Sequence, residues 1–168
     1  VGYSTSGNSI CVGLGDGTML ILESYDRMRL KSRWKHSSEP IRDIKYSYDG
    51  HYIAAASDDG NVYIYWSEDK LSFKRQAVCK GHSGSVLHVD FSADSQTVQS
   101  SGLDGTLQYW TTRGVAIKDN LSMRDEKWGS PTCTFGWAVQ GIWPVHTSAG
   151  SVNCCQAIPE LRVIVAGD

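Results

Sequence analysis

The sequence predicts an all-β fold, an incomplete β-propeller with about three to three and a half four-stranded blades of a larger ring. Three observations lead to this prediction. A pattern of strands and turns recurs roughly every 45 residues. An Asp-Gly pair recurs within each copy, and the chain has six tryptophans and eight tyrosines against three phenylalanines. Tryptophan and tyrosine suit the pleated, half-buried surfaces of β-sheets.

The repeat is clearest in three segments that align without gaps: Gly7–Leu22, Gly50–Tyr65 and Ser95–Trp110. Each has an apolar residue at its fourth position, Asp-Gly at its tenth and eleventh positions, and an alternating strand at its end. Glycine adopts the positive φ that a tight hairpin turn requires, and aspartate tolerates a turn position. Each segment therefore predicts two antiparallel strands joined by a tight turn.

A second layer of the repeat lies upstream, where Ile41–Gly50 aligns with Val86–Ser95 and a histidine precedes each, His36 and His82. One full unit is a histidine, a strand, a turn, a strand, an Asp-Gly turn, a strand ending in tryptophan or tyrosine, and a fourth strand. A ring takes about four to eight blades, so we expect the remaining blades of the same propeller to be partners of this chain. Within one propeller domain we expect the end of a blade at residues 1–35, blades at 36–79 and 80–120, an insertion between blades at 121–151, and the start of the next blade at 152–168.

The third unit, GHSGSVLHVDFSADSQTVQSSGLDGTLQYW at Gly81–Trp110, resembles the WD-repeat family. The resemblance implies a hydrogen-bonded chain that ties the strands of the blade together, with the members His82, Ser100, Asp104 and Trp110. The second unit has partial equivalents, His36 and Asp59, but Ala55 stands where the serine is expected and Tyr65 where the tryptophan is expected. A buried polar chain stabilises a fold only when every member has a partner, so we expect the second chain to be broken or rewired.

The segment after the third unit, RDEKWGSPTCTFGWAVQGIWP at Arg124–Pro144, resembles the EMAP-like family, the echinoderm microtubule-associated protein-like proteins. The resemblance rests on its RD, W, TCT, G and WP landmarks, and it implies part of the second, C-terminal propeller of that family. It further implies a non-catalytic scaffold that binds tubulin or microtubules and organises the cytoskeleton or axoneme. The implied location is the cytoplasm and cytoskeleton, with the ciliary axoneme as one setting. The alternative is a generic WD-repeat adaptor in a signalling or ubiquitin-pathway complex.

The same segment is expected to be an ordered insertion that packs over apolar surface at a blade edge. Its glycines permit bends, and Pro144 blocks continuation of a sheet. The residues expected to pack are Trp128, Phe135, Trp137 and Trp143. The alternative is that the tryptophans are exposed and form a surface for a partner.

Several other functions find no support in the sequence. A net charge of −2 and a pI of about 6.2 give no basic excess for nucleic acid. The uncharged run Gly129–Thr147 is too interrupted by polar residues, glycine and proline to cross a membrane. GLGDGT at Gly13–Thr18 superficially resembles a dinucleotide loop, but a strand is predicted after it instead of the required helix. The cysteines lack zinc-ligand spacing. We therefore expect no enzyme activity, cofactor, metal or small-molecule substrate.

Cations alternate along one stretch of the first unit: Arg27, Arg29, Lys31, Arg33 and Lys35. In a strand this spacing puts all five on one face, with Met28, Leu30 and Trp34 on the other. The strand is expected to be the outermost of its blade. The cations there either protect the edge from pairing with another strand or form a positive stripe that contacts an acidic partner surface, as tubulin would offer.

Overall fold

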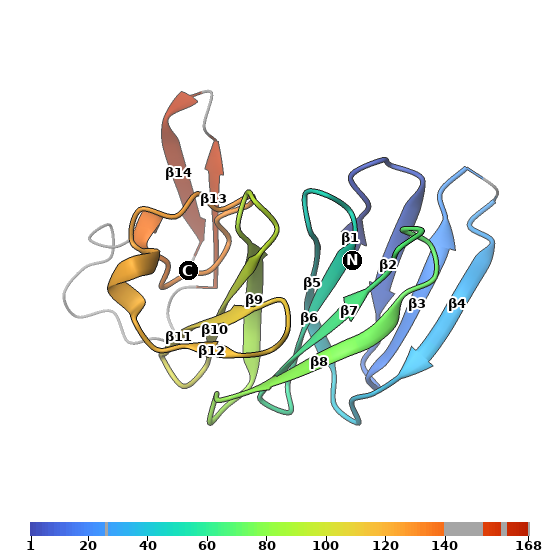
Figure 1. Ribbon diagram of the computed structural model, residues 1–168, viewed down its shortest axis with the longest axis horizontal. Coiled ribbons are helices and arrows are strands. Elements are labelled where there is room, and N and C mark those ends of the chain that lie inside the picture. The colour runs from blue at the N-terminus through green and yellow to red at the C-terminus, as the bar shows by residue number, and fades with distance from the viewer. Residues whose placement is uncertain (26, 140–152, 159–160, 168) are drawn as a thin grey trace.

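The computed structural model describes residues 1–25, 27–139, 153–158 and 161–167, and strands dominate it (Figure 1). Three four-stranded antiparallel sheets follow one another along the chain, and in each the strands are neighbours in chain order. The first sheet consists of β1 (Gly2–Tyr3), β2 (Ser9–Gly13), β3 (Thr18–Glu23) and β4 (Leu30–Lys35). The second consists of β5 (Ile41–Tyr46), β6 (Tyr52–Ser57), β7 (Asn61–Trp66) and β8 (Lys74–Lys80). The third consists of β9 (Val86–Phe91), β10 (Thr97–Gly102), β11 (Leu107–Thr111) and β12 (Ala116–Ile117).

The C-terminal part of the chain adds a smaller sheet. Two 3-10 helices, η1 (Asn120–Met123) and η2 (Trp137–Val139), follow the third sheet. A two-stranded antiparallel sheet, β13 (Cys154–Ile158) and β14 (Val163–Gly167), completes the described structure. The predicted fold, an incomplete β-propeller of about three to three and a half blades, is confirmed.

The Asp-Gly turns have the geometry that the repeat predicted. Gly17, Gly60 and Gly105 have φ values of 83°, 81° and 71°, which only glycine adopts without strain. In each turn the preceding aspartate accepts a hydrogen bond from the backbone N–H two residues further on, at 2.9, 3.0 and 3.1 Å. These bonds hold the short connections between β2 and β3, β6 and β7, and β10 and β11.

The core lies between neighbouring sheets, in two apolar clusters on either side of the second sheet, which buries both faces of its middle strands. In β6, Ile53 and Ala55 belong to the apolar cluster shared with the first sheet, while Ala54 and Ala56 belong to the cluster shared with the third. The small alanine side chains allow the neighbouring sheets to approach β6 closely on both sides. All four residues are fully buried. The first strand of the second sheet, β5, contacts both β1 and β9, so these three strands form the inner side of the propeller and β4, β8 and β12 its outer rim (Figure 1). Among the described residues no helix has the length and apolar character that a membrane span requires.

Candidate interaction surface

The third blade contains a continuous buried chain of polar side chains. His82 Nδ1 lies 3.1 Å from both carboxylate oxygens of Asp104, and His82 Nε2 lies 2.8 Å from Ser100 Oγ. The indole Nε1 of Trp110 donates to the same Ser100 Oγ at 2.9 Å. An ionised carboxylate only accepts, so Nδ1 of the histidine carries the proton and Nε2 accepts from the serine hydroxyl. The structure thus brings all four residues of the expected chain together, and each member has a partner.

The hydrogen bonds also set the charge of Asp104. Burial opposes ionisation of this carboxyl, but donors from His82, the Ser83 backbone and Thr106 outweigh burial and lower its pKa to about 2. The His82 side chain is 1% exposed. Its imidazole is therefore neither open to a substrate nor free to exchange partners, and its role in the blade is architectural.

The corresponding chain in the second blade is rewired. Ser37, not His36, occupies the buried place, with its Oγ 3.0 Å from Asp59 Oδ2 and 2.8 Å from Ser57 Oγ. The loops before β5 and β9 have the same length, but His36 stands one position earlier in its loop than His82 does, so that Ser37 takes the place equivalent to His82. His36 is exposed, and its Nδ1 lies 3.1 Å from the Tyr65 hydroxyl. Asp59 and His36 are therefore not hydrogen-bonded to each other as their counterparts are in the third blade.

The cation-rich stretch differs in geometry from a simple alternating strand. It forms the outermost strand β4, as expected, but β4 starts only at Leu30, and Arg27 lies in the preceding turn with a φ of 45°. The pairing with β3 shifts between Ile21 and Leu22, which leaves Lys31 in a bulge. The expectation that all five cations share one strand face is therefore wrong. Arg33 and Lys35 do share a face, since their cross-strand partners Leu20 and Thr18 alternate along β3.

Carboxylates already neutralise part of this stretch. Lys31 Nζ lies 2.6 Å from one oxygen of Glu23, and Arg29 Nε lies 3.9 Å from the other. Lys35 Nζ lies 3.6 Å from Asp16. Within the described part of the chain, Arg33 is the member of β4 that is exposed and has no ion pair. The net positive field of β4 is accordingly smaller than its composition indicates.

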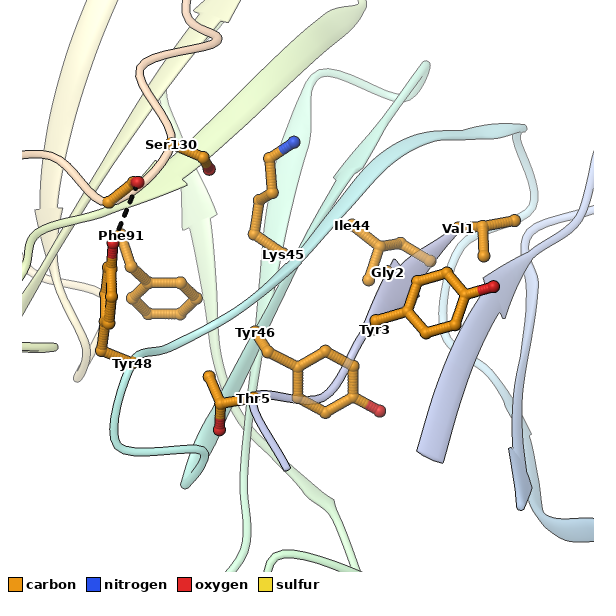
Figure 2. Close-up of a pocket in the computed structure, with 11 residues that line it drawn as sticks. Val1, Gly2, Tyr3, Thr5, Ile44, Lys45, Tyr46, Tyr48, Phe91 and Ser130 are labelled. Carbon is orange, nitrogen blue, oxygen red and sulfur yellow. Dashed lines mark hydrogen bonds between the residues drawn. The ribbon is translucent and has the colours of Figure 1, made fainter. Parts of the chain in front are cut away.

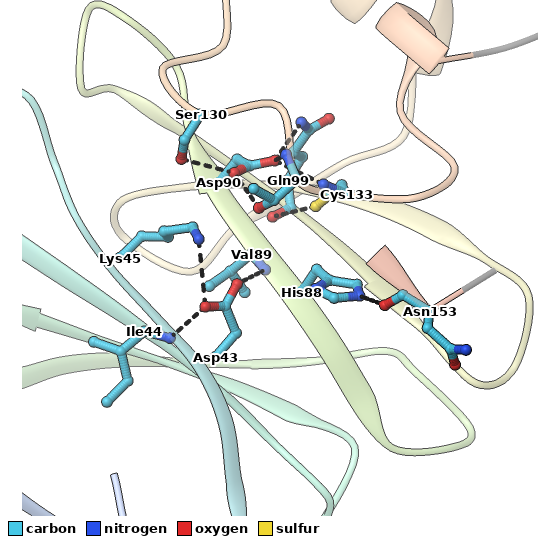
Figure 3. Close-up of polar contacts among 11 residues, drawn as sticks. Asp43, Ile44, Lys45, His88, Val89, Asp90, Gln99, Ser130, Cys133 and Asn153 are labelled. Carbon is cyan, nitrogen blue, oxygen red and sulfur yellow. Dashed lines mark hydrogen bonds and ion pairs between the residues drawn. The ribbon is translucent and has the colours of Figure 1, made fainter. Parts of the chain in front are cut away.

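A buried carboxylate, Asp90 of β9, binds the insertion to the third blade beside the backbone hydrogen bonds of Lys127 and Gly129 (Figure 3). Its oxygens accept from Ser130 Oγ at 3.0 Å, Thr132 N at 2.8 Å, Thr132 Oγ1 at 2.7 Å and Cys133 N at 2.9 Å. Gln99 Nε2, across the strand pair, donates at 3.1 Å. Burial raises the pKa of the Asp90 carboxyl, while the bonds from Thr132 and Cys133 act in the opposite direction. These donors replace the water that a buried carboxylate loses.

The aromatic residues of the insertion pack partly against the blade. The Trp128 ring lies 5.8 Å from that of Tyr109, and Trp137 Nε1 donates to the Asn120 carbonyl at 3.2 Å. Trp128, Phe135 and Trp137 are all half-buried. The fourth residue of the expected set, Trp143, lies outside the described residues. For the other three, packing against the third blade fits the observed burial better than a fully exposed surface of aromatic rings.

Comparisons with known proteins identify the family. The model of the echinoderm microtubule-associated protein second β-propeller matches residues 1–168. This chain belongs to that family. The chain is 33% identical to the human echinoderm microtubule-associated protein-like 3 and 32% identical to the 77 kDa echinoderm microtubule-associated protein of Strongylocentrotus purpuratus, with 99% of the chain covered in both. It spans 19% and 24% of the length of these two relatives.

A hollow on the inner side of this EMAP propeller segment shows how the insertion meets the blades (Figure 2). The hollow, of about 330 Å³, is lined by β1, β5, the end of β9 and the insertion. Tyr48 donates its hydroxyl hydrogen to the Gly129 carbonyl at 3.0 Å. A Cβ added to Gly129 would lie 2.2 Å from the Tyr48 ring, so only glycine permits this approach. Tyr3 and Tyr48 are the exposed aromatic residues at the hollow, at 66% and 55%.

Two positions that matter to the EMAP blades were not singled out from the sequence. Ser37 could have been found by counting back from Asp59 at the same spacing that separates His82 from Asp104. Asp90 alternates with Val89 and Phe91, so a strand pattern places it on a solvent-facing side. Only the insertion, which covers that side, makes it a buried anchor. Among the described residues no group of three or more potential ligands is placed to hold a metal ion.

Proposed function

We propose that this chain is a non-catalytic interaction propeller of a microtubule-associated protein, which binds tubulin or microtubules and organises the cytoskeleton. The observation that carries the proposal is the match to the EMAP second propeller over the whole chain, together with relatives whose names state microtubule association. The division of the chain into blades at 36–79 and 80–120, with 121–151 inserted, stays part of this proposal.

The chemistry of the described residues supports a binding role over catalysis. The polar groups that resemble catalytic sets, such as His82 with Asp104 and Ser100, use their hydrogen bonds to join strands of one blade. Their burial removes them from contact with a substrate. What the propeller offers to a partner is a rigid set of turns and outer strands, and such loops on a rigid scaffold are where binding surfaces usually lie.

The outer strand β4 is one candidate contact surface in this proposal. Its exposed cations, led by Arg33, would meet an acidic protein surface, and the attraction would weaken as salt increases. The alternative is that these cations only prevent β4 from pairing with a strand of another molecule. An alanine triple variant at Arg29, Lys31 and Arg33 separates the two, because edge protection does not affect binding to microtubules.

Co-sedimentation of the complete protein with microtubules tests the function. We expect the protein to pellet with microtubules at low ionic strength and to be released progressively by salt. The triple variant should pellet less and show a flatter salt dependence, and unchanged pelleting would remove β4 from the proposal. A complete protein that stays in the supernatant and binds no soluble tubulin would contradict the function itself and favour a WD-repeat adaptor role.

The cellular setting follows from the same proposal. A propeller bound to microtubules should lie on cytoplasmic arrays, and the axoneme of cilia is one array that it could occupy. Fluorescence imaging of the tagged complete protein in ciliated cells, before and after microtubule depolymerisation, tests the location. Cytoplasmic filaments that vanish on depolymerisation, with or without axonemal signal, are the expected result. A diffuse signal unaffected by depolymerisation would argue against it.

A further inference from the structure

The outer strand of the second blade, β8, carries a set of cations that differs from that of β4. Lys74, Arg75 and Lys80 are all exposed, and β8 contains no acidic residue. Within the described residues none of the three forms an ion pair. This contrasts with β4, where Glu23 and Asp16 hold Lys31 and Lys35. Of these two outer strands, β8 therefore carries the larger unmatched positive charge, three cations against Arg33 alone on β4.

The strand register shows how these side chains are placed. Arg75 pairs with Tyr65 and Lys80 with Asn61, and both partners are on the face of β7 that is turned toward the first blade. The register shifts between the pairs Ile64–Ala77 and Tyr65–Arg75. This bulge keeps Arg75 on the same face of β8 as Val78 and Lys80. Lys74 pairs with Trp66 and projects from the opposite face. Cations thus flank the free edge of β8 on both sides.

Arg75 lies near the aromatic residues that join the first and second blades. The pKa of His36 is lowered, first by burial and second by the positive charge of Arg75. The imidazole ring of His36 lies 5.6 Å from the ring of Tyr65, and the indole ring of Trp34 lies 5.2 Å from it. Arg75 is therefore the cross-strand partner of a tyrosine that belongs to this aromatic group, and it forms no ion pair within the described residues.

The acidic residues nearest to β8 leave this charge largely uncompensated. The turn before β8 contains Glu68 and Asp69, which line a shallow hollow with Lys74 and Trp66. The Asp69 carboxylate is hydrogen-bonded within its own turn. It accepts hydrogen bonds from the Ser67 hydroxyl and from the backbone N–H groups of Leu71 and Ser72. Glu68 is thus the single free carboxylate in that hollow, so Arg75 and Lys80 carry most of the available charge.

We propose that β8 is the docking site for an acidic, extended polypeptide segment, whose carboxylates contact Arg75, Lys80 and Lys74. Charge complementarity selects this occupant: a strand edge that bears only cations repels a second copy of itself and attracts a strand or tail that bears only carboxylates. The guanidinium of Arg75 offers two parallel N–H donors to one carboxylate. The inference rests on the proposed function, and it adds β8 to β4 as a surface that contacts an acidic part of the partner.

Binding of a fluorescent oligoglutamate peptide to the complete protein, followed by anisotropy at low ionic strength, tests the site. The variant Lys74→Ala/Arg75→Ala/Lys80→Ala should bind about tenfold more weakly, because each of three exposed ion pairs contributes a factor of roughly two. The matched control Arg113→Ala/Arg124→Ala/Lys127→Ala removes the same charge from exposed positions outside β8 and should change the affinity less than about twofold. The conservative variant Arg75→Gln/Lys80→Gln keeps the packing of the side-chain stems and should still weaken binding.

Two results would overturn the inference: equal affinity of the β8 variant and the parent protein, or an equal loss in the control, which would mean attraction to net charge alone. Microtubule co-sedimentation of the same proteins keeps the two proposals apart. A parent that pellets with microtubules but binds oligoglutamate independently of β8 contradicts the docking site and leaves the function standing. A parent that binds the peptide through β8 but never pellets contradicts the function instead.

Discussion

Replacement of Asp90 by alanine should detach the insertion from the third blade. The change removes the acceptor of five hydrogen bonds and leaves the backbone N–H of Cys133 and the side-chain amide of Gln99 without that acceptor in a buried place, while the Thr132 N–H keeps its bond to the Ser130 carbonyl. Each orphaned buried donor costs about 1–3 kcal/mol. Relief from burying a carboxylate offsets part of this cost, so we expect a net loss of about 3–5 kcal/mol in local stability.

The asparagine variant at the same position should be milder. Its amide nitrogen can take the place of the oxygen that faces the hydroxyls of Ser130 and Thr132, because a hydroxyl can also accept a hydrogen bond. Its remaining oxygen still accepts from the backbone N–H groups of Thr132 and Cys133. The expected loss is about 1–2 kcal/mol, which keeps the protein folded for measurement.

Hydrogen exchange measured by mass spectrometry on the complete protein is the assay. Peptides that cover residues 128–137 should exchange faster in both Asp90 variants, with alanine well above asparagine, while peptides from β6 and β7 should be unchanged. Asp69→Ala is the matched control, since the Asp69 side chain accepts hydrogen bonds only within its own exposed turn between β7 and β8. If the insertion exchanges at the parent rate in Asp90→Ala, Asp90 does not anchor it and the reasoning fails.

Three further predictions concern the blade chains. Ser100→Ala leaves the Trp110 indole N–H buried without a partner and should cost about 2–3 kcal/mol, seen as a lower unfolding temperature than for an exposed serine control. Ser37→Ala should destabilise the protein more than His36→Ala in thermal unfolding, because Ser37 is the buried member of the rewired set; the reverse order would contradict that assignment. The folded pKa of Asp104 is about 2, below its ordinary value, so its stabilisation is present above about pH 4 and is lost as the pH falls toward 2. Asp104→Asn should remove that part of the acid sensitivity in unfolding measured across this range.

The sequence was sufficient to predict the fold because the repeat consists of local signals, each of which involves residues close together in the chain. Asp-Gly pairs specify tight turns through glycine's φ and the aspartate acceptor, and alternating apolar residues specify strands. Both signals act within a few residues, so the turns at Gly17, Gly60 and Gly105 form where the repeat placed them. The chain of His82 to Trp110 was also accessible, because the family resemblance links residues by fixed spacing.

The placement of the β4 cations and the role of Ser37 depended on contacts between strands, which residue spacing alone does not predict. The alternation from Arg27 to Lys35 predicted one charged face, but a turn and a bulge broke the period, and carboxylates from β3 and the turn before it took up part of the charge. The rewiring at Ser37 followed from the place of His36, which stands one position too early in its loop to reach Asp59 as His82 reaches Asp104. In each case a local rule was overridden by a partner from another strand.

What the sequence determined by itself was the set of strands, the tight turns between them and the blade-like repeat, because these depend on backbone preferences and on periods of a few residues. Tertiary structure alone decided which side chains are buried. The insertion folds back over the third blade and turns an alternate strand position, Asp90, into a buried anchor. Likewise, carboxylates of β3 and of the turn before it pair with Lys31 and Lys35 of β4, while the cations of β8 form no ion pair within the described residues. Burial and ion pairing depend on residues that are distant in the chain. They contribute to stability only after folding has brought those residues into contact.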